Sequence, residues 1–413
     1  MNHSLKLCFI AASNNIHTKR WLQFFIEQGH QVFCLSDKEG EIPGAEVFLL
    51  PNRDTLLGEK KKAKKKDVIQ ARAIRIKELV AEIQPDIVHA HYLYLRGWSA
   101  ALADVRPLII SLWGSDIQLE KVYYRNAFHL FRDQLLNRLA LTQADMITGM
   151  SPNLARLGQK AVGKHIPVEV VPLGANLEQF QANLEPEKMD AFRASLHIPS
   201  DSLIVLSPRI MVPLYNIETI IDSIPKVLEE LPNTVFILKD TVSDTEERRN
   251  YVSELRQHVE RLGVGAAVRW VNELPYESLP MLYTLADVIV SIPTADGMPV
   301  TLFEAMACGT PVIVGNLVTY DSVIDHNKTG LRIPPKDSAA LSLCILQLLK
   351  NPQLSEQLVQ AAYGIVKEFG NYQYHLKRME KYYFQLASLG NQSKSSLWRR
   401  FTQFCFRQAV SRL

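Results

Sequence analysis

The sequence is poor in cysteine and has no long apolar run. Its five cysteines are widely separated and odd in number, and none lies in a Cys-x-x-Cys pair. This spacing argues against a disulfide framework and against a cysteine zinc site. No stretch approaches the roughly 18 apolar residues of a membrane span, and the opening MNHSLKLCFIAAS predicts a first β-strand rather than a signal peptide. We therefore expect a cytoplasmic protein whose cysteines are reduced.

The sequence also lacks a strong net charge, yet its charge is uneven. The formal net charge is +3, and residues 1–175 hold 23 Lys and Arg against 17 Asp and Glu. Six of the seven residues of Lys60–Lys66 are lysine, and residues 391–413 carry five basic residues and no acid. Nucleic acid is one candidate partner for such clusters. No nucleic-acid motif is present, so we favour the anionic inner face of a membrane over nucleic acid.

Apolar strands alternate with helical segments in both halves of the chain. At 413 residues the sequence is too long for one ordinary core. Strands such as LKLCFIAAS, DIVHAHY, SLIVLSPR and PVIVGN are separated by amphipathic stretches of 10–20 residues. This alternation predicts parallel sheets joined by crossover helices, hence an α/β protein with two domains.

The segment Ser291–Val314, SIPTADGMPVTLFEAMACGTPVIV, carries the clearest chemical signal. It predicts a strand, a tight turn at Asp296–Pro299, a short helix and a second strand. A helix start offers unpaired N–H groups and a partial positive charge, which suit a phosphate or diphosphate. Asp296 and Glu304 could accept hydrogen bonds from hydroxyls on either side of it. A sugar nucleotide fits this pattern, while an ordinary αβ unit with solvated acids is the alternative.

This segment closely resembles the Glu-x7-Glu signature of the retaining glycosyltransferases of family 4 (glycosyl transferases group 1), which have the GT-B fold. Asp296 stands where the first Glu usually is, Glu304 matches the second, and EAMACGTPVIV matches almost letter for letter. The resemblance covers about residues 5–385. It implies two Rossmann-like parallel-sheet domains that face each other across a cleft.

The resemblance also divides the chain. It implies an acceptor-side domain over residues 1–175 and a domain over 176–370 that binds the nucleotide sugar. A helix over 371–390 would cross back to the first domain, and residues 391–413 would form a basic amphipathic tail. VPLGANLEQF resembles the segment that joins the two domains in this family.

Donor contacts follow from the same resemblance. Arg209, at the end of SLIVLSPR, would hold the donor diphosphate bidentately. The Lys that usually follows is missing; Tyr215 lies in its place, and Lys239 is an alternative source of charge. Glu304 would bind the ribose, and Asp296 the transferred sugar, which makes Asp296 and Arg209 the candidate catalytic residues. The remaining donor contacts would be backbone N–H groups near Met298, Val300 and Thr301.

Three residues of the first half are candidates for the acceptor side. His17 lies in SNNIHTKRW after the first strand, where Asn14 and Asn15 replace the usual glycines. His91 ends the strand IVHAH, whereas His89 is expected to be a hydrogen-bonded core residue. Asp116 lies in SLWGSDI, where Trp113 replaces a His of many family members. For each candidate a structural role is the alternative: surface exposure, core packing or helix capping.

The tail SSLWRRFTQFCFRQAVSRL predicts a basic amphipathic helix. Its expected apolar face comprises Leu397, Trp398, Phe401, Phe404, Cys405, Ala409 and Val410. Its expected polar stripe comprises Arg399, Gln403, Arg407 and Ser411. Such a helix suits an anionic membrane interface, so a peripheral membrane position is predicted. Packing against the body of the protein, or against a partner, is the alternative.

The sequence as a whole predicts a retaining glycosyltransferase of the hexosyltransferase type. The donor would be a nucleoside-diphosphate sugar and the acceptor a hydroxyl of a glycan, a lipid-linked saccharide or a small molecule, as in polysaccharide biosynthesis. No cofactor and no metal are expected, because no Asp-x-Asp motif lies at the relevant strand ends. The alternatives are a non-catalytic sugar-nucleotide-binding subunit and an epimerase or phosphorylase of the same fold.

Overall fold

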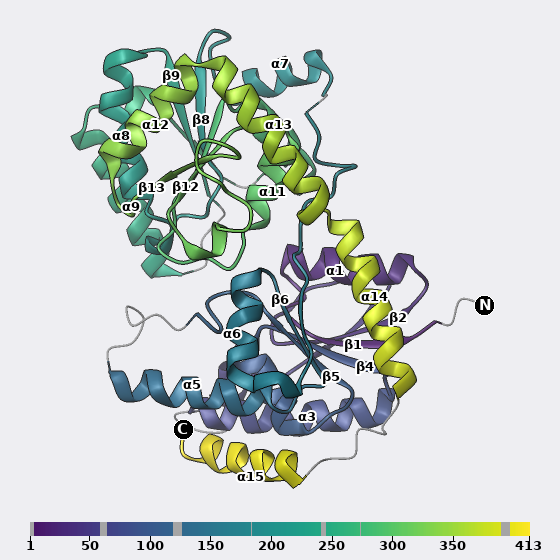
Figure 1. The fold of residues 1–413 in the computed structure, drawn as a ribbon. Coiled ribbons are helices and arrows are strands. Elements are labelled where there is room, and N and C mark those ends of the chain that lie inside the picture. The colour runs from purple at the N-terminus through teal and green to yellow at the C-terminus, as the bar shows by residue number, and fades with distance from the viewer. Residues whose placement is uncertain are drawn as a thin grey trace. The chain divides into compact units, whose positions relative to one another are not determined.

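Short apolar strands alternate with helices along both halves of the chain and build two separate parallel sheets (Figure 1). The structure is a computed structural model that describes residues 4–57, 64–118, 126–182, 184–240, 245–272, 274–389 and 397–413. Its contacts divide the chain into an N-terminal unit, Met1–Leu173 with Gln373–Leu413, and a C-terminal unit, Gly174–Tyr372. The prediction of two Rossmann-like parallel-sheet domains is confirmed.

The N-terminal unit is built on a seven-stranded parallel sheet in the order β3-β2-β1-β4-β5-β6-β7. The strands are β1 Lys6–Ile10, β2 Gln31–Ser36, β3 Ala45–Leu49, β4 Ile87–His91, β5 Leu108–Leu112, β6 Met146–Gly149 and β7 Val168–Val170. The helices are α1 Ile16–Glu27, α2 Arg53–Leu57, α3 Lys65–Ile83, α4 Trp98–Ala103, α5 Ala127–Leu141, α6 Pro152–Val162, α14 Tyr372–Leu389 and α15 Leu397–Ser411.

The C-terminal unit is built on a six-stranded parallel sheet in the order β10-β9-β8-β11-β12-β13. The strands are β8 Leu203–Ser207, β9 Thr234–Lys239, β10 Val268–Val271, β11 Val288–Ser291, β12 Val312–Gly315 and β13 Leu331–Ile333. The helices are α7 Pro186–Ser195, α8 Ile217–Glu230, α9 Glu246–Arg261, α10 Leu279–Leu285, α11 Val300–Ala307, α12 Ser338–Lys350 and α13 Pro352–Phe369.

Each sheet reverses its winding direction once. The reversal lies between β1 and β4 in the N-terminal unit and between β8 and β11 in the C-terminal unit. In open parallel sheets, ligands bind beyond the carboxyl ends of the strands at such a switch point. The fold therefore directs attention to the loops that follow these four strands.

Helix α14 is anchored on the N-terminal sheet by buried polar contacts. Tyr383 is fully buried, and its hydroxyl lies 2.6 Å from Nδ1 of His89. Nε2 of His89 lies 2.7 Å from Oγ of Ser111, so His89 is a satisfied core residue, as its position deep in the strand predicts. Glu380 adds a contact of 2.9 Å to Nε2 of His30. Aromatic and histidine side chains thus hold the last long helix of the body in place.

Helix α15 packs against α3, α4 and α5 of the N-terminal unit and lies outside them (Figure 1). Its buried face contains Thr402, Gln403, Phe406 and Val410, whereas Phe401 and Phe404 are exposed. The predicted faces are therefore partly wrong. Gln403 turns inward because its amide donates to the carbonyl of Ala101 (3.0 Å), and this bond satisfies a polar group that burial would otherwise penalise.

The lysine run is only partly described. Residues 58–63 lie outside the described part of the chain, and so do residues 390–396 of the predicted tail. Lys65 is not simply solvated, since its ammonium lies 3.4 Å from Asp133 and 4.0 Å from the centre of the Tyr94 ring. Burial, opposed by Asp133, lowers the pKa of Lys65 to about 8. Lys66 donates to the carbonyl of Ser411. These two lysines therefore connect α3 with α5 and with the end of α15.

Candidate functional site

The loops after β8 and β11 meet around the guanidinium of Arg209. Its Nη2 lies 3.0 Å from Oδ2 of Asp296, and its Nη1 donates to Oγ1 of Thr301 over 3.2 Å. The guanidinium also stacks on the ring of Tyr215, 4.1 Å from its centre. Burial by itself would lower the pKa of Arg209, but Asp296 and Tyr215 outweigh it and raise that pKa. The structure thus brings together four of the predicted donor residues as a fixed, charged cluster.

The turn before α11 is held rigidly. The carboxylate of Asp296 accepts from the N–H of Gly297 (2.8 Å) and from the hydroxyl of Tyr320 (3.2 Å). Thr319 donates to the carbonyl of Gly297 over 2.6 Å. Burial, reinforced by Asp296, raises the pKa of Tyr320 well above its ordinary value, so this phenol stays a donor. Sequence reasoning missed Thr319 and Tyr320, which belong to a later loop with no motif of its own.

Helix α11 begins at Val300 directly after Pro299, which caps it without a side-chain hydrogen bond. Proline has no N–H, and it is well placed before a helix because its φ is fixed. Met298 and Val300 are each only 6 % exposed, so the predicted backbone donors lie against packed side chains. The helix ends at Ala307, and Gly309 adopts a φ of +76° beyond it. This short helix start faces the Arg209 cluster through Thr301.

Glu304 is a buried carboxylate held by two phenols. It is 2 % exposed, and its oxygens accept from Tyr276 (2.8 Å) and Tyr283 (3.2 Å). Burial and the adjacent carboxylate raise the pKa of Tyr283, so its hydroxyl remains protonated. The ring of Phe180 covers both phenols. Two neutral donors therefore orient the carboxylate that the sequence assigns to the ribose.

Lys239 ends β9, next to the strand that precedes Arg209, and is half-buried. The described contacts include no bond between Lys239 and Arg209. The following residue, Asp240, accepts from the N–H of Met211 (3.2 Å) and from the guanidinium of Arg248. Asp240 therefore fixes the loop after β8, a role that the sequence did not signal. Lys239 as a replacement for the missing lysine stays a prediction.

In the N-terminal unit, the rings of His91, Trp113 and Trp21 form an aromatic cluster at the switch point. His91, the last residue of β4, is 2 % exposed, and neither ring nitrogen has a hydrogen-bond partner among the described residues. Its ring lies 5.3 Å from Trp113 and 5.2 Å from Trp21. Burial, and secondly the charge of Arg96, lowers the pKa of His91 to about 3. The imidazole is therefore neutral at physiological pH.

His17 lies near the same group, and α1 is capped from within. The ring of His17 is 6.4 Å from that of Trp113. The side chain of Asn15 accepts from the N–H groups of His17 (2.8 Å) and Thr18 (3.3 Å). Asn15 has a φ of −84°, so it stands in the place of a usual glycine without adopting a positive φ. Close approach is instead provided by Gly40, where a Cβ would collide with the backbone of Asn14.

Asp116 serves the loops after β4 and β5. Its carboxylate accepts from the N–H groups of Leu93 (2.8 Å), Gly114 (2.8 Å) and Trp113 (3.1 Å), and it is 1 % exposed. Burial raises its pKa, against the effect of these hydrogen bonds. The structure therefore gives Asp116 a loop-ordering role, which is close to the structural alternative of capping. An acceptor contact through this carboxylate stays a prediction.

The loop after β4 carries unusual backbone geometry. Tyr92 and Leu95 have φ values of 79° and 58°, although neither is glycine. The hydroxyl of Tyr92 lies 2.6 Å from Oγ of Ser115, and Arg96 donates twice to Asp37. Such outliers persist only where the surroundings hold them, and they cluster at ligand sites. This strained loop adjoins His91 and Trp113.

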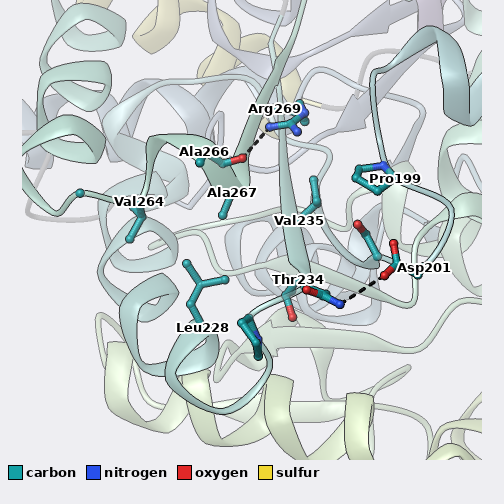
Figure 2. A pocket seen from close by; sticks show the side chains of 13 residues that line it. Pro199, Asp201, Leu228, Thr234, Val235, Val264, Ala266, Ala267 and Arg269 are labelled. Atoms are coloured by element: carbon teal, nitrogen blue, oxygen red, sulfur yellow. Dashed lines mark hydrogen bonds between the residues drawn. The ribbon is translucent and has the colours of Figure 1, made fainter.

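A hollow of about 310 Å³ lies at the opposite, amino-terminal ends of β8, β9 and β10 (Figure 2). The amide of Asn233 donates to Asp201 over 3.3 Å, and Arg269 donates to the carbonyl of Ala266 over 2.8 Å. The polar groups of the hollow are therefore paired within the protein, Asn233 with Asp201 and Arg269 with Ala266. Because ligands bind at the carboxyl ends in this fold class, the hollow is not the donor site.

Metal and membrane features complete the description. Within the described ranges, no group of three His, Cys, Asp or Glu side chains is arranged to hold a metal ion. In the same residues, every helix is too short or too polar to cross a membrane.

Two family models match the chain. The model described as glycosyl transferases group 1 matches residues 188–364, and the model described as glycosyl transferase 4-like matches residues 6–151. Together they cover more than three quarters of the sequence.

Two curated relatives share between a fifth and about a quarter of their aligned residues with this chain. A putative teichuronic acid biosynthesis glycosyltransferase, TuaC of Bacillus subtilis, is 22 % identical over 289 residues, which are 68 % of this chain and 66 % of TuaC. A D-inositol 3-phosphate glycosyltransferase of Jonesia denitrificans is 26 % identical over 203 residues, 49 % of this chain and 48 % of that protein. The chain thus spans about half to two thirds of the length of these relatives.

Solved structures share the fold over nearly the whole chain. Sucrose-phosphate synthase from Thermosynechococcus elongatus superimposes with a TM-score of 0.78 at 19 % identity, covering 93 % of this chain and 100 % of that one. HepE of Anabaena, solved in complex with UDP and glucose, gives a TM-score of 0.75 at 17 % identity, with 92 % and 100 % coverage.

Proposed function

The chain belongs to the glycosyl transferases group 1, with a family 4-like N-terminal part, and from this premise we propose that it transfers a sugar with retention from a nucleoside-diphosphate sugar to a hydroxyl acceptor. The observation that carries the proposal is the Arg209 cluster. A guanidinium fixed by Asp296, Tyr215 and Thr301 lies beside the start of α11 at the switch point of a parallel sheet. That combination suits a diphosphate.

Arg209 and the start of α11 would stabilise the negative charge that develops on the leaving diphosphate. Fixed donors of this kind accelerate a reaction because they need no reorganisation in the transition state. Glu304, oriented by two phenols, would accept hydrogen bonds from the ribose. Asp296 would accept from a hydroxyl of the transferred sugar. A phosphate oxygen of the leaving group would take the acceptor proton on the same face, so that no side-chain base is needed.

The donor assignment has support beyond the motif. HepE, which shares the fold, was solved with UDP and with UDP-glucose. The names of relatives refer to teichuronic acid biosynthesis, to O-antigen chain mannosyl transfer and to mannosyl transfer onto a phosphatidylinositol monomannoside. These names favour a saccharide or lipid-linked acceptor. A hexosyl donor, a cytoplasmic setting and a peripheral membrane position are parts of the same proposal.

The test is transfer by the purified chain with UDP-, GDP- and ADP-sugars and a panel of acceptors. We expect nucleoside diphosphate release only when an acceptor is present, and a product whose anomeric configuration, read by NMR, equals that of the donor. Arg209→Gln should slow transfer about a hundredfold or more, the usual size for loss of one fixed donor. Unchanged transfer by this variant, or an inverted product, would refute the assignment.

A second candidate is a subunit that binds the sugar nucleotide without catalysis. Two observations favour it: Tyr215 replaces the usual lysine, and the charge of Arg209 is already balanced by Asp296. This candidate predicts that calorimetry detects donor binding while no acceptor yields product.

For the proposed transferase, addition of EDTA checks the expected metal independence, since sugar transfer should continue in its presence.

A further inference from the structure

A cavity of about 290 Å³ lies between α15 and the turn that follows α4, entirely within the N-terminal unit. Four of its lining residues are arginines, namely Arg106, Arg399, Arg400 and Arg407. The acid that lines it is Asp104. Four guanidinium groups and the carboxylate of Asp104 line this small cavity. Asp145, which pairs with two of the arginines, supplies a second carboxylate, so the site keeps a net positive charge.

The inner arginines are fixed in place. Arg106 and Arg399 both donate to the same oxygen of Asp145, over 2.8 and 3.0 Å. Arg399 also donates to the carbonyl of Gln143. Because one carboxylate serves two guanidiniums, the floor of the cavity keeps a net positive charge. Guanidinium groups held in this way are ready to bind phosphate oxygens bidentately.

The rim of the cavity combines positive charge with exposed aromatic rings. Arg400 and Arg407 are exposed, and Phe404, which also lines the cavity, is 60 % exposed. Phe401, one helical turn earlier on the same face, is 59 % exposed. Exposed phenylalanines between arginines are typical of helices that lie in a membrane interface, and a soluble phosphate gives no reason for them.

We propose that this cavity binds the phosphate group of an anionic phospholipid while Phe401 and Phe404 enter the interfacial layer of the bilayer. Helix α15 then holds the N-terminal unit on the membrane surface. Helix α15, which supplies Arg399, Arg400, Phe404 and Arg407 to this site, lies outside the ranges matched by the two family models, residues 6–151 and 188–364. The inference gives the peripheral membrane position proposed above a specific site, and it does not depend on sugar transfer.

The test is co-sedimentation of the purified full-length chain with vesicles of phosphatidylcholine, with or without one quarter phosphatidylglycerol. We expect binding only to the anionic vesicles, weakened as salt rises. Each basic residue near an anionic leaflet contributes about 1 kcal/mol, so the double variant Arg400→Gln/Arg407→Gln should bind about thirtyfold more weakly. The double variant Arg156→Gln/Lys160→Gln, which removes two exposed charges from α6 of the same unit, should bind as the parent does.

The aromatic part has its own matched pair. Phe401→Ser/Phe404→Ser should lose most of the vesicle binding. The control is Phe128→Ser/Phe131→Ser on α5, where two phenylalanines with the same spacing are 66 % and 64 % exposed. Asp104→Asn should tighten binding, because it removes a negative charge from the cavity. The fold should be kept, because asparagine also tolerates the φ of 58° at this position. Equal losses in the two phenylalanine pairs would overturn the assignment to α15.

A last arm separates lipid from free phosphate. If inorganic phosphate at millimolar concentration raises the melting temperature of the chain while vesicles are not bound, the site holds a soluble anion and the proposal is wrong. Binding of pure phosphatidylcholine vesicles as strongly as anionic ones would overturn it as well. Transfer to a soluble acceptor, measured on the same arginine variant, should stay unchanged, which distinguishes failure of this site from failure of the glycosyltransferase assignment.

Discussion

The two units treat polar side chains at their switch points in opposite ways. In the C-terminal unit the charges are paired in place, Arg209 with Asp296 and Glu304 with two phenols. In the N-terminal unit His91 is neutral, buried among aromatic rings and, within the described chain, without a hydrogen-bond partner. Under the proposed function, anion recognition would reside in the C-terminal unit, and the N-terminal unit would select its ligand by shape, stacking and single hydrogen bonds.

The helix starts in the two units differ in the same sense. The side chain of Asn15 occupies the first N–H groups of α1, whereas Pro299 leaves those of α11 without a side-chain cap. A capped helix start has satisfied part of its donors and is a weaker anion site. Of these two starts, α11 is therefore the better cradle for a diphosphate.

The strongest way to break this comparison is Asp296→Asn. The substitution removes the ion pair to Arg209 and the acceptor for the sugar hydroxyl. We expect transfer to fall about a hundredfold, while affinity for the nucleoside diphosphate stays equal or rises, because the guanidinium loses a competing carboxylate. Single-turnover kinetics and calorimetry measure the two quantities.

The matched control is Asp325→Asn, an exposed acid of the same unit that pairs with the exposed Lys328. It should leave both transfer and binding unchanged. If nucleoside diphosphate affinity falls in step with transfer in Asp296→Asn, the carboxylate supports the diphosphate site, and the division of roles between Asp296 and Arg209 is wrong.

A second, smaller effect is expected from Glu304→Gln. A hydrogen bond to a charged acceptor contributes about 1.5–3 kcal/mol, so nucleoside diphosphate should bind at least about tenfold more weakly. Inorganic diphosphate, which has no ribose, should bind the variant and the parent equally. Competition calorimetry with both ligands makes the comparison. Equal weakening of both ligands would place Glu304 at the phosphates instead of the ribose.

The pH dependence tests the neutral side of the comparison. The pKa of His91 is lowered to about 3 by burial, while the unfolded chain takes up a proton near pH 6.5. The unfolded state therefore binds more protons between these values, and stability is complete above about pH 6.5 and is lost as the pH falls. The slope is about 1.4 kcal/mol per pH unit for each such group.

The variant His91→Leu should remove this slope for one group. Melting temperatures at pH 7 and pH 5 should differ less in the variant than in the parent, and the part that remains reflects His89, whose pKa burial also lowers. A variant that keeps the parent's full pH dependence would show that His91 is protonated in the folded chain.

The architecture was readable from the sequence, because the alternation of strands and helices is a local signal. The strands expected in LKLCFIAAS, DIVHAHY, SLIVLSPR and PVIVGN are β1, β4, β8 and β12 of the structure. The edge strand β3 was missed, since none of its residues is fully buried and its apolar pattern is weak. The face of α15 was misassigned because Gln403 is buried through one hydrogen bond that no helical periodicity predicts.

The site was readable only where a motif named it. Arg209, Asp296 and Glu304 lie in segments that match family motifs, and in the structure each has defined hydrogen-bond or ion-pair partners. Tyr276, Tyr283 and Tyr320 complete that setting from three other segments, and only folding brings them near. Asp116 was predicted to be a cleft acid from its place after a strand. Its three backbone donors come from two loops that meet only in the folded chain, so the sequence could not reveal them.

The smallest predicted effect concerns the capped helix start. Asn15→Ala should lower stability by about 1 kcal/mol, and Asn15→Gly by only a few tenths, because glycine is a tolerated cap. If α1 does not hold the diphosphate, both variants should transfer sugar within about twofold of the parent once differences in the folded fraction are removed. Thermal unfolding and initial rates measure the two quantities. A rate that rises in Asn15→Gly, with nucleoside diphosphate affinity rising beside it, would mean that the N–H groups freed at His17 and Thr18 bind the donor, and that α1 rather than α11 alone serves as the cradle.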